Sequence, residues 1–129
     1  DCQYTKQYCE ENIYLLARQL LAVEPECRAS VVFISNERRT VPLWCQSASR
    51  DDSTLVVWDY HVILVVQTSK SDAMVYDFDA MLPFPCPWSE YVQMVFQPDI
   101  ALQDGFLRQF RVVPARDYID HFSSDRSHM

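Results

Sequence analysis

Three residues of this chain carry side chains that could act together on an amide or ester carbonyl: Cys9, His61 and Asp77. A cysteine thiolate is a strong nucleophile, and an imidazole can move protons close to neutral pH. A carboxylate can hold such an imidazole in one tautomer and stabilise its charged form. The three residue types therefore indicate nucleophilic chemistry at a thiol, if the fold brings them together.

Cys9 begins a segment with the period of an amphipathic helix. Ile13, Leu16, Ala17 and Leu20 recur at helical spacing, so we expect a helix over residues 9–22 that stops before Pro25. A thiol in the first turn of a helix experiences the positive end of the helix dipole, which favours the thiolate. Two acids follow at once, at positions 10 and 11, and oppose that effect. Taken alone, Cys9 could equally be an inert buried cysteine.

His61 and Asp77 fall on two adjacent apolar segments, residues 55–66 and 74–78, which we expect to be strands. A lone histidine in a strand is more often a core or edge residue than a catalytic one. If the two strands form a hairpin centred near residue 69, His61 and Asp77 lie directly opposite each other, with Cβ atoms about 5 Å apart. A half-buried carboxylate needs a partner, and this register supplies His61. A shift by one residue would place the pair on opposite faces.

The remaining patterns complete an α+β outline with a mostly antiparallel sheet. We expect further strands at 31–34 and 41–44, a last strand at 106–113, a helix capped by Ser89 and running to Phe96, and a terminal helix at 115–122. The proline-rich stretch 82–87 is expected to be extended. We find no internal repeat or long linker, so we expect one domain over residues 1–129.

Composition excludes several classes of protein. The formal charge of −7 argues against a nucleic-acid binder and against an anionic membrane surface as partner. The five cysteines contain no C-x-x-C pair, which favours a reduced intracellular chain and no zinc site. Gly105 is the only glycine, so a glycine-rich phosphate loop is excluded. We expect neither a metal nor an organic cofactor.

Seven segments of the chain resemble one family, the protein N-terminal glutamine amidohydrolases. The most specific of them is Trp58-Asp59-Tyr60-His61-Val62. In chain order, the matching segments begin at Cys9-Glu10-Glu11-Asn12, Val32-Phe33-Ile34-Ser35, Trp58-Asp59-Tyr60-His61, Tyr76-Asp77-Phe78-Asp79, Leu82-Pro83-Phe84-Pro85, Phe110-Arg111-Val112 and Ser124-Asp125-Arg126-Ser127.

The resemblance implies a catalytic triad of Cys9, His61 and Asp77, the residues selected above on physical grounds. It implies a papain- or transglutaminase-like cysteine hydrolase core whose N-terminal helix bears the nucleophile. It also implies conversion of N-terminal Gln to N-terminal Glu in the N-degron pathway, in the cytoplasm and the nucleus. Family members continue past the last matching segment, so the chain is either a shortened form or one that lacks a C-terminal segment.

The substrates implied are proteins or peptides with a free N-terminal Gln, and we expect the chain to act as a monomer. Their α-ammonium needs an acid close to the triad, for which Glu11, Asp59 and Asp79 are candidates beside Glu10, and Trp58 is a candidate pocket wall. Each of these acids, taken singly, is more often solvated or structural. We expect the other four cysteines to be inert: Cys2, Cys27, Cys45 and Cys86.

Two other functions stay open. A non-catalytic reader with the same pocket would bind N-terminal Gln without turnover. A transglutaminase-like acyl transferase would pass the same thioester to an amine rather than to water.

Overall fold

The structure of the chain, a computed structural model, describes residues 6–49, 53–68 and 72–127, with the side chains of 6–9 and 122–127 outside that description. All strand pairings in this part are antiparallel, which confirms the predicted α+β class with a mostly antiparallel sheet. The strands are β1 (Arg28–Ser35), β2 (Val41–Leu43), β3 (Val56–Trp58), β4 (His61–Gln67), β5 (Met74–Tyr76), β6 (Cys86–Pro87) and β7 (Gln109–Pro114). The helical segments are α1 (Lys6–Val23), α2 (Trp88–Tyr91), a π-helical turn (Val92–Phe96), a 3₁₀ turn (Asp104–Phe106) and α3 (Ala115–Ser127).

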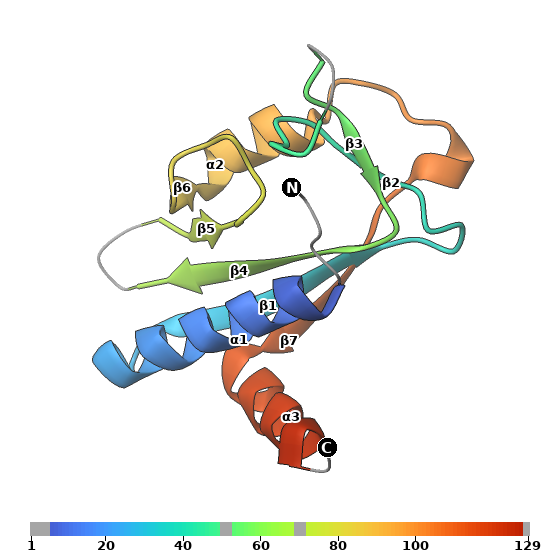
Figure 1. Cartoon of the computed structure of the whole chain (residues 1–129). Helices are drawn as coiled ribbons and strands as arrows, with labels where there is room; N and C mark the ends of the chain where they lie inside the picture. The colour runs from blue at the N-terminus through green and yellow to red at the C-terminus, as the bar shows by residue number, and fades with distance from the viewer. Residues whose placement is uncertain (1–5, 50–52, 69–71, 128–129) are drawn as a thin grey trace.

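Five strands form the main sheet in the order β6-β5-β4-β1-β7, and β2 pairs with β3 in a separate two-stranded sheet. Helices α1 and α3 lie on one side of the main sheet, while α2 and the β2–β3 pair lie on the other (Figure 1). Each side has its own core, because alternate residues of β1 and β4 point to opposite faces. Ala17, Val31 and Leu64 belong to the core under α1. Ile63 and Tyr91 belong to the core under α2.

Helix α1 begins at Lys6, three residues before the predicted start, and ends at Val23. Cys9 is therefore the fourth residue of the helix rather than its first. The first turn contains no acidic residue, so the expectation that Glu10 and Glu11 occupy it is wrong. The buried face of the helix carries Ile13 and Ala17, as the periodicity predicts.

The predicted strand 55–66 is two strands that belong to different sheets. β3 ends at Trp58, and β4 begins at His61. Between them the Asp59 carboxylate accepts a hydrogen bond from the Tyr60 backbone N–H at 2.9 Å. A short polar side chain that bonds to nearby backbone competes with a strand ladder, and this bond accompanies the break.

The second half of the chain follows the prediction with shifted boundaries. The proline-rich stretch is non-helical, and its last two residues form β6 at the edge of the sheet, where proline is tolerated. The predicted helix 89–96 is present but starts at Trp88 and becomes π-helical after Tyr91. Its N-cap is Pro87, so Ser89 does not cap it. β7 spans Gln109–Pro114, and α3 is longer than predicted.

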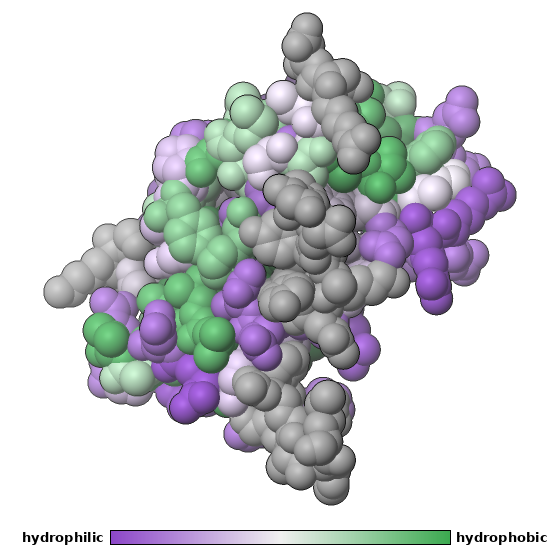
Figure 2. All heavy atoms as spheres, in the orientation of Figure 1, coloured by the Kyte–Doolittle hydropathy of each residue, from purple (hydrophilic) through white to green (hydrophobic). Residues whose placement is uncertain are grey.

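The surface is mixed in polarity. Figure 2 shows separate hydrophobic patches between hydrophilic areas on the face that it presents. No helix among the described residues is long and apolar enough to span a membrane.

Candidate active site

His61 is the first residue of β4, and its side chain points to the α2 side of the sheet together with Ile63. The β4–β5 register pairs Leu64 with Tyr76 and Val65 with Val75. Continued past the end of β5, this register places Asp77 beside Ile63 and leaves His61 two residues further along. The predicted face-to-face pairing of His61 with Asp77 is therefore wrong by two residues.

The pair nevertheless shares one face, because a two-residue shift is a whole period of a strand. Diagonal neighbours in a sheet remain within reach of long side chains. His61 Nε2–H donates to Asp77 Oδ1 at 2.9 Å, and the side chain of each residue is 2% exposed. The structure thus confirms the predicted contact, on a different register.

Asp77 accepts hydrogen bonds on both carboxylate oxygens. Besides His61, the backbone N–H of Asp79 donates to Oδ1 at 2.9 Å. The Tyr91 hydroxyl donates to Oδ2 at 2.6 Å. Three donors converge on one buried carboxylate, so its position and its charge are both stabilised.

The electrostatics of His61 and Asp77 favour a charged pair. Burial lowers the pKa of His61, but the charge and hydrogen bond of Asp77, with the charge of Asp79, outweigh burial and raise that pKa above its ordinary value. Burial raises the pKa of Asp77, but His61, the Tyr91 hydroxyl and the Asp79 N–H outweigh burial and lower it. An imidazole so placed can hold a proton and release it to a neighbouring atom.

Trp58 covers one face of the imidazole. The two rings stack with centroids 5.0 Å apart and an interplanar angle of 26°. The indole Nε1–H donates to Gln46 Oε1 at 3.2 Å, and Gln46 Nε2 donates to the Trp44 carbonyl at 3.1 Å. Gln46 is fully buried, so this chain of bonds fixes the indole against His61.

A second acid, Asp79, approaches the other ring nitrogen. Its Oδ2 lies 4.0 Å from His61 Nδ1, and the residue is 4% exposed. Burial, with the charge of Asp77, raises the pKa of Asp79 although the charge of His61 opposes the change. The backbone of Asp79 is held by Ser47, whose N–H and hydroxyl both donate to the Asp79 carbonyl. Sequence-distant loops thus place a carboxylate at the nitrogen that Asp77 does not use.

The segment with this site also matches a known family. Residues 4–129 match the family model described as N-terminal glutamine amidase. The chain belongs to this family. Its relatives include proteins named protein N-terminal glutamine amidohydrolase from Drosophila ananassae and Drosophila mojavensis, each 47% identical over 131 residues. The relative of that name from Drosophila pseudoobscura pseudoobscura is 47% identical over 133 residues. All of this chain is covered in each comparison, and the chain spans 64% of the length of each relative.

In this member of the N-terminal glutamine amidase family, the backbone of Cys9 belongs to α1, and its side chain lies outside the described residues. The next residue, Glu10, is bonded to the residue before β4: the Tyr60 hydroxyl donates to Glu10 Oε2 at 2.6 Å. Glu10 follows Cys9 and Tyr60 precedes His61 in the sequence. The structure therefore brings the end of α1 that carries Cys9 to the strand end that carries His61.

The other acids named from the sequence are less well placed than Asp79. Alternation along one strand over residues 55–66 would place Asp59 on the face of His61, but Asp59 lies between β3 and β4, so this interpretation is wrong. It lines a surface hollow of about 340 Å³ with Phe33 and Arg111. Glu11 is half-buried on α1, and Trp58 stacks on His61 as described above.

The three cysteines whose side chains the structure describes are free, and two of them have surroundings that disfavour a thiolate. Burial, followed by nearby acids, raises the pKa of both Cys27 and Cys86. Cys45 is half-buried. Cys2 and His128 lie outside the described residues. These observations agree with the expectation that Cys27 and Cys86 are inert.

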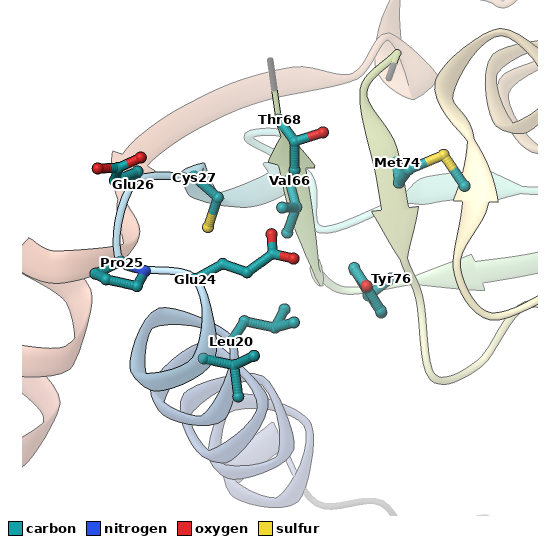
Figure 3. Close-up of a pocket in the computed structure, with 10 residues that line it drawn as sticks. Leu20, Glu24, Pro25, Glu26, Cys27, Val66, Thr68, Met74 and Tyr76 are labelled. Atoms are coloured by element: carbon teal, nitrogen blue, oxygen red, sulfur yellow. The ribbon is translucent and has the colours of Figure 1, made fainter. Parts of the chain in front are cut away.

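Another hollow, of about 960 Å³, is not part of this site. Its lining includes Val66 and Thr68, at the opposite end of β4 from His61, together with Glu24, Cys27 and Tyr76 (Figure 3). Among the described residues, His61, Asp77 and Asp79 are the one group of possible metal ligands whose atoms all lie within 4.8 Å of one another. Asp77 already accepts three hydrogen bonds there.

Two residues of the site were missed by the sequence reasoning. Tyr91 belongs to a short helix with no signal that its hydroxyl faces a carboxylate. Gln46 lies in a polar segment between the predicted strands 41–44 and 55–66. Both reach the site only through the tertiary fold.

Proposed function

We propose that the chain hydrolyses the side-chain amide of an N-terminal glutamine to give N-terminal glutamate and ammonia. Cys9 is the nucleophile, His61 the acid and base, and Asp77 the residue that orients His61. The observation that carries the proposal is the buried bond from His61 Nε2 to Asp77 Oδ1 in a chain of the N-terminal glutamine amidase family. Relatives spanning the whole chain are named for this reaction.

The orientation of the imidazole supports these roles. Asp77 occupies Nε2, so Nδ1 is the nitrogen left for proton transfer with the thiol. A hydrogen bond joins Tyr60, the residue before His61, to Glu10, the residue after Cys9. This bond supports a short distance between the backbones of His61 and Cys9. A histidine held by a carboxylate and facing a thiol is the arrangement that activates cysteine nucleophiles.

The reaction follows in two halves. The Cys9 thiolate attacks the carboxamide carbon, and the carbonyl π electrons move to oxygen. The intermediate collapses with cleavage of the C–N bond, while protonated His61 gives its proton to the departing ammonia. Water then attacks the thioester, His61 accepts a proton from that water, and the C–S bond breaks to release glutamate and restore the thiolate. No oxidant or cofactor is needed for this balance.

The oxyanion formed in both halves needs hydrogen-bond donors. The first N–H groups of a helix have no partner within the helix. Because α1 begins at Lys6, we assign the donors to the first turn of α1, which ends at Cys9, rather than to the Cys9 N–H alone.

Recognition of a chain start requires an acceptor for the α-ammonium, and we infer that Asp79 supplies it. Its carboxylate is buried 4.0 Å from His61 Nδ1, the nitrogen assigned above to proton transfer with the thiol. Glu10 is bonded to Tyr60 instead, Asp59 bonds to its own backbone turn, and Glu11 lies on α1 without a described contact to His61. Trp58 then acts as the wall that covers His61 rather than as a substrate contact.

Finer features of the proposal follow from the family resemblance. We propose a papain- or transglutaminase-like core, a monomeric protein in cytoplasm and nucleus, and a role in the N-degron pathway. Protein and peptide substrates with free N-terminal Gln are the partners.

Mass spectrometry of a Gln-starting peptide after incubation with the chain tests the proposal. We expect a mass gain of about 1 Da, the replacement of NH₂ by OH, with ammonia released in equal amount, and neither product with Cys9→Ala. Cys27→Ala and Cys45→Ala, which also remove a thiol, are the matched controls and should retain activity. Binding without ammonia would indicate a reader, and a peptide–amine adduct formed with added primary amine would indicate an acyl transferase.

A further inference from the structure

Glu10, the residue after Cys9, is held from two directions by tyrosine hydroxyls. Tyr60, directly before β4, donates to the Glu10 carboxylate at 2.6 Å. Tyr118, in α3, donates to its backbone carbonyl at 3.0 Å. We call these three residues the Glu10 clamp.

The two tyrosines are anchored in different parts of the fold. Tyr118 is 5% exposed in the core under α1, and its ring packs at 58° against Phe33 with centroids 6.0 Å apart. Tyr60 packs against the same core and is followed directly by His61. The clamp therefore joins the start of α1 to the sheet and to the C-terminal helix at one point.

These hydrogen bonds are important because the end of a helix is its least stable part. The first residues of a helix lack backbone partners and fray, so a nucleophile there has no fixed position without tertiary contacts. A displacement of the order of 1 Å between reacting groups can lower a rate by roughly 100-fold. Two hydrogen bonds at the residue next to the nucleophile limit that displacement.

We propose that Tyr60 and Tyr118 are positioning residues that hold the Cys9-bearing turn of α1 in reach of His61, through Glu10. The inference rests on the proposed function in one respect, that Cys9 is the nucleophile.

The clamp also changes the electrostatic surroundings of the Cys9 thiol, in addition to fixing the backbone. A carboxylate beside a thiol disfavours the thiolate. The Tyr60 hydroxyl donates to that carboxylate and so disperses part of its charge, whereas Tyr118 touches only the neutral carbonyl. Changes at Tyr60 and at Tyr118 should therefore differ in their effect on thiolate formation.

The test measures three quantities on single variants: turnover of a Gln peptide, melting temperature, and the pH dependence of Cys9 alkylation by iodoacetamide, resolved by peptide mass spectrometry. We expect Tyr60→Phe to lower kcat roughly 10-fold with KM within about twofold, and to move the alkylation midpoint to higher pH. Tyr118→Phe should lower kcat similarly and leave the midpoint in place. Glu10→Gln keeps an acceptor for Tyr60, so it should retain most of kcat and move the midpoint to lower pH, while Glu10→Ala should lose kcat.

Tyr76→Phe is the matched control, since Tyr76 lines the hollow with Glu24 and Cys27, near the other end of α1 from Glu10, and it should match the wild type in all three measurements. The inference is overturned if Tyr60→Phe and Tyr118→Phe keep wild-type kcat, or if Glu10→Gln loses as much kcat as Glu10→Ala. If the tyrosine variants do not fold, the two Glu10 variants still decide the inference.

Should the wild type deamidate no Gln peptide, the proposed function fails. The alkylation midpoints would then decide the clamp alone: opposite shifts for Tyr60→Phe and Glu10→Gln support it, and unshifted midpoints reject it.

Discussion

The imidazole of His61 donates from Nε2 to Asp77 Oδ1 at 2.9 Å, although the two residues are diagonal rather than opposite neighbours across β4 and the segment after β5. A turn follows Asp77, in which the Ala80 N–H donates to the Asp77 carbonyl, and the carboxylate of Asp79 in this turn lies 4.0 Å from His61 Nδ1. Each ring nitrogen therefore faces its own acid. The hydrogen bonds and the charge of His61 lower the pKa of Asp77, whereas burial raises the pKa of Asp79.

Replacing Asp77 by Asn tests the orienting role. The amide preserves the shape of the site but can favour the wrong imidazole tautomer, so we expect kcat to fall by at least about 100-fold. Turnover of a Gln peptide by the variant is the measurement, with circular dichroism to verify the fold. Wild-type kcat in a folded Asp77→Asn protein would contradict the assignment.

The charged pair also predicts a pH dependence of stability. The raised pKa of His61 contributes stability that is complete below its unfolded value of about 6.5 and is lost as pH rises through the folded value. The lowered pKa of Asp77 contributes stability that is present above about pH 3.9 and is lost as pH falls through its folded value. The raised pKa of Asp79 acts in the same sense as that of His61, and its contribution is lost as pH rises through the folded value.

Melting temperatures measure this dependence. We expect the wild type to melt at a higher temperature near about pH 5.5 than near about pH 8.5, and the difference to shrink in His61→Gln. An equal difference in both proteins would show that His61 does not cause it.

Tyr91→Phe tests the third donor to Asp77. The variant removes the hydroxyl from a fully buried position and leaves Oδ2 without that hydrogen bond. Losing a hydrogen bond to a buried charge typically costs about 1.5–3 kcal/mol, so urea unfolding should show a loss of this size. The pKa of Asp77 should also rise, which would move the acid limb of the activity profile to higher pH. Tyr76→Phe serves again as control, and equal stability of the two variants would contradict the prediction.

The Trp58–Gln46 bond predicts a non-additive pair of substitutions. Trp58→Phe leaves Gln46 Oε1 unpaired in a fully buried site, and Gln46→Leu leaves the indole N–H unpaired, each at about 1–3 kcal/mol of folding stability. The double variant removes both polar groups and should lose less than the sum of the single losses. Chemical denaturation of the four proteins measures the coupling, and strict additivity would argue against the bond.

Much of the fold could be predicted from the sequence, in the segments where apolar residues recur with a clear helical or strand period. Ile13 and Ala17 fix the buried face of α1, and the β-branched runs give most of the strands. Parity along the strands was enough to bring His61 and Asp77 to one face. The register itself was not predictable, since the polar sequence between the two strands does not single out one residue as the centre of a hairpin.

Other features depend on tertiary partners that a linear pattern does not contain. The Asp59 carboxylate bonds to the Tyr60 N–H at the point where a long apolar run divides between two sheets. The hydroxyl of Tyr91 reaches Asp77 only because α2 packs over that face. The start of α1 lies outside its apolar repeat, so the periodicity could not place it.

Substrate selectivity is the most discriminating prediction, because the proposed reaction occurs only at chain starts. If Asp79 binds the α-ammonium, N-acetylation of a Gln peptide removes the charge and should lower kcat/KM by roughly 10- to 150-fold, the equivalent of about 1.5–3 kcal/mol. Asp79→Asn should lower kcat/KM for the free peptide, chiefly through KM, and should narrow the difference in kcat/KM between free and acetylated peptides. Glu11→Gln, a matched change of acid to amide on α1, should have neither effect.

An N-terminal Asn peptide should react poorly, because its carboxamide falls about one C–C bond short of the thiolate when the ammonium is anchored. Parallel ammonia assays on the three peptides make the measurement. Equal rates on free and acetylated Gln peptides would remove the N-terminal requirement and leave a general glutaminase.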